Sequence, residues 1–187
     1  MRRLTITPAN PIRLLHELKA VVMSVRYTHT NLIAQDRERL VAFYETVFGC
    51  ERLSPQRDLC GRWLDEATGI AQARIRGTHL LLPGHGLSGP TLEIFQYDPA
   101  KARAGTGINT PGYAHIAFAV DDVAAVARSV REHGGRDVGT LTSVELPSIG
   151  SIEFQYVTDP EGNIIELQKW RTPPNPTAPS GHTSGDE

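Results

Sequence analysis

Residues 113–135 read YAHIAFAVDDVAAVARSVREHGG, and this stretch decides the fold because it repeats an earlier one. Its opening tripeptide, Tyr113-Ala114-His115, matches Tyr27-Thr28-His29 at an offset of 86 residues, from 113 − 27 and 115 − 29. The same offset aligns three further pairs: Asp36 with Asp122, Leu40 with Val126, and Gly49 with Gly135. A repeat at a fixed offset indicates two copies of one supersecondary unit.

Each copy reads as a strand, a helix and a glycine turn. Apolar residues at helical spacing predict helices over about residues 36–48 and 122–133. Asp36 and Asp122 stand where helix N-caps are expected, and Gly49 and Gly134 stand where the helices should end.

Strand-like runs follow each helix. They cover residues 73–82 and 91–97 in the first copy, and 152–158 and 163–169 in the second. The turn-forming sequence at 159–162, DPEG, should join the last two strands as a hairpin. We predict an α+β fold in which two paired βαβββ modules form a curved mixed sheet around a cavity.

The expected organisation has five parts. They are an N-terminal extension at 1–23, a first module at 24–97, a linker at 98–111, a second module at 112–171 and a disordered tail at 172–187. Asn10 and Pro11 are suited to starting a short helix in the extension. An equally weighted alternative is a poorly ordered segment, with translation naturally beginning at Met23.

Strand alternation predicts where the polar residues of the repeat point. Around His115, the neighbours Ile116 and Phe118 share the face that should pack on the helix, so His115 faces the other way. The same reasoning separates Glu93 and Glu166 from the apolar residues on either side of them. The expected binding face thus lies on the side of the sheet opposite the helices.

Both modules end with an acid in a similar frame, Leu92-Glu93-Ile94 in the first and Ile165-Glu166-Leu167 in the second. Pairing of the modules would bring together two half-sites, each with one histidine and one glutamate. A lone strand histidine is more often a hydrogen-bonded core residue than a ligand. Four polar residues at repeat-related positions favour the ligand interpretation. Burying an unpaired carboxylate is unfavourable in free energy, and a bound metal ion offsets that penalty.

The composition argues against two classes of binding partner. A net charge of −2 and few aromatics, without interleaved basic residues, argue against nucleic acid. No apolar run approaches the roughly 20 residues that span a bilayer, and the N-terminus lacks a signal-peptide apolar stretch. The expectation is a cytoplasmic protein with no nucleic-acid or membrane partner.

The repeat and its motifs resemble the vicinal oxygen chelate superfamily, which includes glyoxalase I, methylmalonyl-CoA epimerase, extradiol dioxygenases and bleomycin-resistance proteins. The resemblance covers about residues 25–170. The segments that carry it are 27–34, 44–49, 92–97, 112–123 and 159–167.

The resemblance implies four metal ligands: His29, Glu93, His115 and Glu166. This set is similar to a bacterial glyoxalase I pattern, whereas the epimerases usually carry Gln at the place of Glu93. Imidazole and carboxylate ligands suit one divalent ion, with Zn, Ni, Co, Mn, Fe and Mg all open. In the family the metal stabilises an enolate-like species while a carboxylate moves a proton, a role expected here of Glu166 first and Glu93 second.

The leading functional hypothesis is a metal-dependent isomerase or lyase acting at a carbon next to a carbonyl, either glyoxalase-like or epimerase-like. One alternative is an extradiol-type, ring-cleaving iron dioxygenase, which the fourth ligand makes less attractive. The other is a non-catalytic small-molecule or drug-binding protein. The site can form within one chain or across the expected homodimer, and the sequence leaves this choice open.

Three further residues have competing interpretations. His79 could face the cavity, although a structural or surface role is favoured. Asp65 and Glu66 lie where some epimerase-like relatives place a second base, but a solvated helix face is the preferred interpretation for them.

Overall fold

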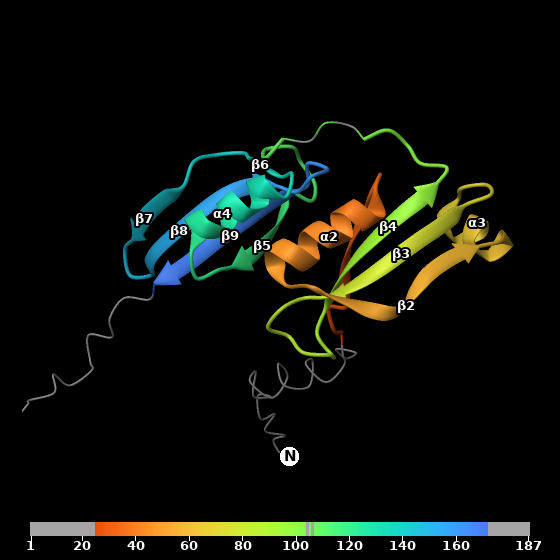
Figure 1. Ribbon diagram of the computed structural model, residues 1–187, viewed down its shortest axis with the longest axis horizontal. Helices are drawn as coiled ribbons and strands as arrows, with labels where there is room; N and C mark the ends of the chain where they lie inside the picture. The colour runs from red at the N-terminus through yellow and green to blue at the C-terminus, as the bar shows by residue number, and fades with distance from the viewer. Residues whose placement is uncertain (1–24, 104, 106, 172–187) are drawn as a thin grey trace, which may run out of the picture.

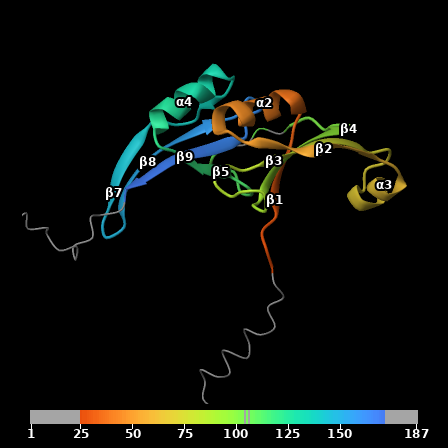
Figure 2. The ribbon, with the colours of Figure 1, turned by 60° about the horizontal axis from the view of Figure 1, so that its bottom comes forward.

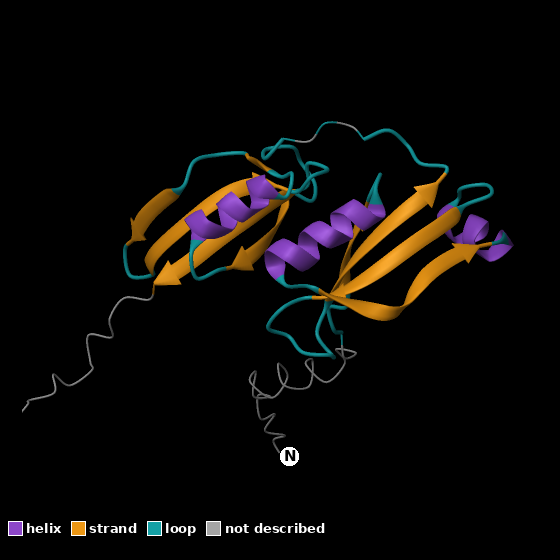
Figure 3. Ribbon diagram, in the orientation of Figure 1, coloured by secondary structure: helices purple, strands orange, loops and turns teal. Residues whose placement is uncertain are grey.

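The computed structural model describes residues 25–103, 105 and 107–171. The predicted N-terminal extension and C-terminal tail lie outside these ranges. Within them, the chain forms two mixed sheets with three helices, side by side along the long axis of the molecule (Figure 1). Figure 3 shows the same arrangement by element type.

The first module contains four strands and two helices. In chain order they are β1 (His29–Ile33), α2 (Arg37–Phe48), β2 (Glu51–Cys60), α3 (Arg62–Thr68), β3 (Arg74–Leu81) and β4 (Thr91–Asp98). The strand order is β1-β4-β3-β2, with β1 parallel to β4 and the other pairs antiparallel.

The second module repeats this plan. Its elements are β5 (His115–Ala119), α4 (Val123–Glu132), β6 (Arg136–Asp137), β7 (Thr142–Leu146), β8 (Gly150–Thr158) and β9 (Ile164–Arg171). The order is β5-β9-β8-β6, β7 also pairs with β8, and β5 is parallel to β9. The predicted α+β fold with paired βαβββ modules is confirmed.

Two details depart from a simple repeat. The first module carries α3, whose Leu64 packs with Ala73 and Ile75 in a small separate core. In the second module, the strand after the helix is divided into β6 and β7. There the amides of Val138 and Gly139 both reach the carbonyl of Tyr156, which interrupts the regular ladder.

The predicted helix boundaries are confirmed at their caps. Asp36 accepts a hydrogen bond from the amide of Arg39 at 3.1 Å, and Asp122 accepts one from Ala125 at 2.8 Å. At the end of α2, Gly49 adopts φ 67°, a left-handed conformation that favours glycine. None of the helices in the described ranges is long and apolar enough to cross a membrane.

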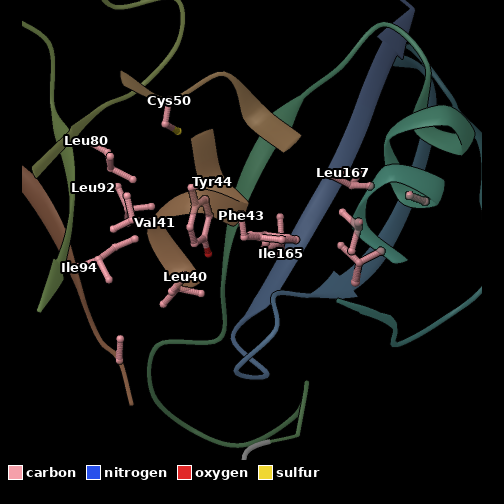
Figure 4. Packing of buried hydrophobic residues seen from close by; sticks show 14 of the residues in the cluster. Leu40, Val41, Phe43, Tyr44, Cys50, Leu80, Leu92, Ile94, Ile165 and Leu167 are labelled. Atoms are coloured by element: carbon pink, nitrogen blue, oxygen red, sulfur yellow. The ribbon is translucent and has the colours of Figure 1, made fainter. Parts of the chain in front are cut away.

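The two helices α2 and α4 lie on the same side of the two sheets (Figures 1 and 2). The residues beneath them form one continuous apolar core that includes both modules. Figure 4 shows Phe43 of α2 beside Ile165 of β9, and Phe48 stacks on Phe118 of β5 with ring centroids 4.1 Å apart. The opposite sheet face is therefore available for the polar residues of the repeat.

The β8–β9 turn at 159–162 binds directly to α2. Tyr44 is fully buried and donates its hydroxyl to Asp159 Oδ2 at 3.1 Å. The carboxylate of Glu161 accepts hydrogen bonds from the amides of Gln35 and Asp36 at 2.8 and 2.7 Å. Burial raises the pKa of Asp159, while its hydrogen bonds with Asn163, Glu161 and Tyr44 oppose that rise.

Tyr44→Phe is expected to lower the free energy of unfolding by about 1–3 kcal/mol, because it leaves a buried carboxyl without one of its donors. Urea denaturation followed by circular dichroism measures the change. Tyr97→Phe is the matched control, because the Tyr97 hydroxyl has no hydrogen bond to a described residue. Equal stability of the two variants would contradict a stabilising role for the Tyr44–Asp159 contact.

Candidate metal centre

The register of the first sheet brings three strands together around Glu93. Parallel pairing of β1 with β4 places Asn31 beside Glu93, and antiparallel pairing of β3 with β4 places His79 on its other side. Leu92 and Ile94 are buried in the main core, so Glu93 points to the opposite face. The alternation predicted for this strand is confirmed.

The carboxylate of Glu93 is buried, with 7% of the residue exposed, and three side chains surround it. His29 Nδ1 lies 3.4 Å and His79 Nδ1 3.2 Å from Glu93 Oε1. Asn31 Nδ2 donates to Oε2 at 3.4 Å. Burial lowers the pKa of His79, and the charge of Glu93 acts in the opposite direction.

The second sheet repeats the pairing in a simpler form. His115 Nε2 lies 3.1 Å from Glu166 Oε2, with Ile165 and Leu167 buried in the core on the other face. Tyr156 is opposite Glu166 in the register of β8 and β9, and its ring centroid is 5.3 Å from that of His115. Burial, and then the charge of Glu166, raise the pKa of Tyr156.

The four predicted ligands therefore form two His–Glu pairs, one on each sheet. No ion pair or hydrogen bond between described residues joins one pair to the other. In the same ranges, no group of three or more His, Cys, Asp or Glu side chains is arranged to hold a metal ion. The four-ligand site stays a prediction, because within one chain its two halves remain separate pairs.

Each pair has donors of the type that a divalent ion prefers. Carboxylate oxygen with imidazole nitrogen is a borderline-to-hard ligand set, suited to Zn, Ni, Co, Mn, Fe or Mg. Glu93 is nine-tenths buried beside two imidazoles and one amide, and a buried carboxylate is stabilised when a cation approaches it. The residues present therefore fit a divalent metal, provided that the two pairs meet.

The strands that begin with the two histidines lie at the ends of their sheets. β1 is the end strand of the first sheet and β5 of the second, so neither has a strand hydrogen-bonded on its outer side within the described chain. His29 is the first residue of β1 and His115 the first of β5. Both half-sites are thus located beside free sheet edges.

Asn31 was not among the residues predicted for the site, and a structural or surface role was favoured for His79. Aligning Asn31 with Ala117 at the repeat offset was a usable signal, because it shows a polar residue in one copy only. The contact of His79 depends on the register between β3 and β4, which the intervening loop sets. The solvated helix face predicted for Glu66 is supported, because Glu66 pairs with Arg62 on an exposed face of α3. Asp65 instead accepts hydrogen bonds from the amides of Gln72 and Ala73.

The fold and the candidate site together define the class of this protein. It is an α+β protein of two repeated modules, and each module has one His–Glu pair on the sheet face opposite its helix. Residues 26–167 match the family described as Glyoxalase/Bleomycin resistance protein/Dioxygenase superfamily. The chain belongs to this family. The matched range runs from before β1 to the first half of β9 and contains the positions of all four predicted ligands.

Two curated relatives are lactoylglutathione lyases. The one from Salmonella typhimurium is 27% identical over 146 residues, spanning 76% of this chain and 91% of its own length. The one from Haemophilus influenzae is 28% identical over 146 residues, with 74% and 88% covered.

Solved structures show the same fold. A glyoxalase family protein from Bacillus cereus has a TM-score of 0.68 and 18% identity, with 81% of this chain and 97% of that chain covered. A fosfomycin resistance protein from Listeria monocytogenes has a TM-score of 0.50 and 18% identity, with 80% and 96% covered. At these identities, the likeness concerns the fold alone.

Proposed function

We propose that the chain is a metal-dependent lyase or isomerase that acts at a carbon next to a carbonyl, with lactoylglutathione lyase-like chemistry first and epimerase-like chemistry second. The observation that carries the proposal is the repeated pairing of a strand histidine with a strand glutamate, His29 with Glu93 and His115 with Glu166. The similarity to lactoylglutathione lyases over most of their length supports the choice of reaction and a thiol-conjugated substrate.

The proposed metal site is shared between two chains of a cytoplasmic homodimer. His29 and Glu93 of one protomer would meet His115 and Glu166 of its partner, because the two pairs are not in contact within one chain. The free edges of β1 and β5 support this arrangement, since a second copy can pair there. A two-fold dimer assembled in this way has two complete sites.

The bound cation would offset negative charge that develops on the oxygens of the substrate. Glu166 is the proposed base that removes the proton from the carbon next to the carbonyl and returns it to the neighbouring carbon. Among the ionisable side chains of the described residues, His115 is the one whose nitrogen lies within ion-pair distance of this carboxylate, at 3.1 Å. All four residues would hold the metal, and Glu166 would in addition transfer the proton.

Metal analysis after aerobic purification is expected to find about one divalent ion per chain, because the repeat supplies one set of four ligands. Oxygen uptake with a catechol is measured on the same sample. Bound iron together with catechol-dependent oxygen uptake would contradict the proposed lyase or isomerase and would favour the ring-cleaving dioxygenase. A dimer without metal, which also takes up none from added Zn, Ni or Co, would favour a non-catalytic binding protein.

A further inference from the structure

The two acids of the repeat have different neighbours at equivalent positions. In the first sheet, the strand positions on either side of Glu93 hold Asn31 and His79. In the second sheet, the positions on either side of Glu166 hold Ala117 and Tyr156. The modules share a backbone plan, so these differences lie in the side chains that face each acid.

The contacts of the two acids differ accordingly. Glu93 Oε1 lies 3.4 Å from His29 Nδ1 and 3.2 Å from His79 Nδ1, and Glu93 Oε2 accepts a hydrogen bond from Asn31. Glu166 is contacted at Oε2 by His115, and within the described residues its Oε1 accepts no hydrogen bond. Glu93 is also the more buried of the two, with 9% of its side chain exposed against 16% for Glu166.

We propose that His79, assisted by Asn31, is a positioning residue that fixes the carboxylate of Glu93 as a metal ligand. This inference rests on the proposed function, and it divides the roles of the two acids. Glu93, held from two neighbouring strands, keeps one orientation. Glu166, without these partners, keeps the rotational freedom that a carboxylate needs in order to reach a substrate proton.

A histidine suits this position for an electrostatic reason. A neutral imidazole with its proton on Nδ1 can donate to a carboxylate without cancelling the negative charge that attracts a cation, and His79 Nδ1 lies 3.2 Å from Glu93 Oε1. An arginine or lysine at the same place would compete with the metal for that charge. Hydrogen bonds from neighbouring side chains to metal ligands orient them and raise the affinity of the site.

The test compares His79→Leu with His79→Gln in the metal-stripped, full-length protein. The leucine variant removes the donor but keeps an apolar body that can pack beside Phe95, whose ring centroid lies 5.8 Å from that of His79. Its Co²⁺ affinity, measured by chelator competition, is expected to fall about 10- to 100-fold. The glutamine variant retains an N–H donor and is expected to bind within about threefold of wild type.

The visible absorption spectrum of the Co²⁺-loaded protein provides a second readout, because it reports the ligand geometry. We expect a changed spectrum in His79→Leu and a restored one in His79→Gln. Asn31→Ala, which makes the first module match Ala117 of the second, should lower Co²⁺ affinity by about threefold, since its contact is long. His85→Leu, in an exposed loop, is the matched control and should match wild type.

The outcomes separate this inference from the proposed function. Wild-type affinity and spectrum in His79→Leu would overturn the positioning role alone. Equal loss of Co²⁺ in His79→Leu and His79→Gln would also overturn it, because a retained donor should rescue a positioning role. If wild-type protein binds no Co²⁺, the proposed function fails, and this inference fails with it.

Discussion

In Glu166→Gln, turnover is expected to fall by roughly 10²- to 10⁴-fold, the usual cost of losing acid-base catalysis. The amide keeps the size of the side chain and one oxygen ligand, so metal binding should weaken modestly. Hemithioacetals and 2-substituted acyl thioesters are screened by NMR in heavy water. Wild-type holoprotein should exchange a carbon-bound proton with solvent or move it to the neighbouring carbon, and the variant should lose this activity.

Two comparisons make the result specific. Glu132→Gln changes an exposed glutamate at the end of α4 and should leave exchange unchanged. Glu93→Gln should weaken metal binding, with turnover largely recovered at saturating metal. If turnover at saturating metal falls further in Glu93→Gln than in Glu166→Gln, the base is Glu93 and the assignment of Glu166 is wrong.

His115→Ala is expected to weaken metal binding by more than about 100-fold, because it removes a direct ligand and even supporting residues are worth 10- to 100-fold. The far-ultraviolet circular dichroism should stay close to that of wild type, since the main core lies on the other face of β5. Elemental analysis after dialysis measures the loss. His85→Ala is the matched control, and full metal retention in His115→Ala would contradict the ligand assignment.

The same variant tests whether the site is shared between chains. A heterodimer of His29→Ala and His115→Ala protomers should contain one intact site, built from the unmutated histidine of each chain. Unfolding and refolding an equal mixture should therefore restore about a quarter of the wild-type metal content, given random pairing. No recovery in the mixture would support a site within one chain.

The sequence predicted the elements that local patterns determine. The repeat, the Asp36 and Asp122 caps and the hairpin turn at 159–162 depend on residues close together in the chain, and the structure confirms them. The direction in which Glu93 and His115 point follows from strand alternation, which needs no knowledge of tertiary packing.

The remaining features depend on long-range geometry. The place of His79 beside Glu93 is set by how β3 aligns with β4 across an intervening loop, and no local pattern specifies that register. The division of one strand into β6 and β7 depends on two amides sharing the Tyr156 carbonyl. Whether the two half-sites meet depends on how two copies of the chain pair, and local sequence patterns do not specify that pairing.

The attachment of the β8–β9 turn to α2 limits how this duplicated protein can be divided into fragments. A fragment ending before residue 112 would lose the acceptors for the Tyr44 hydroxyl and for the amides of Gln35 and Asp36. Although each module carries a complete strand-and-helix plan, the halves are not interchangeable units.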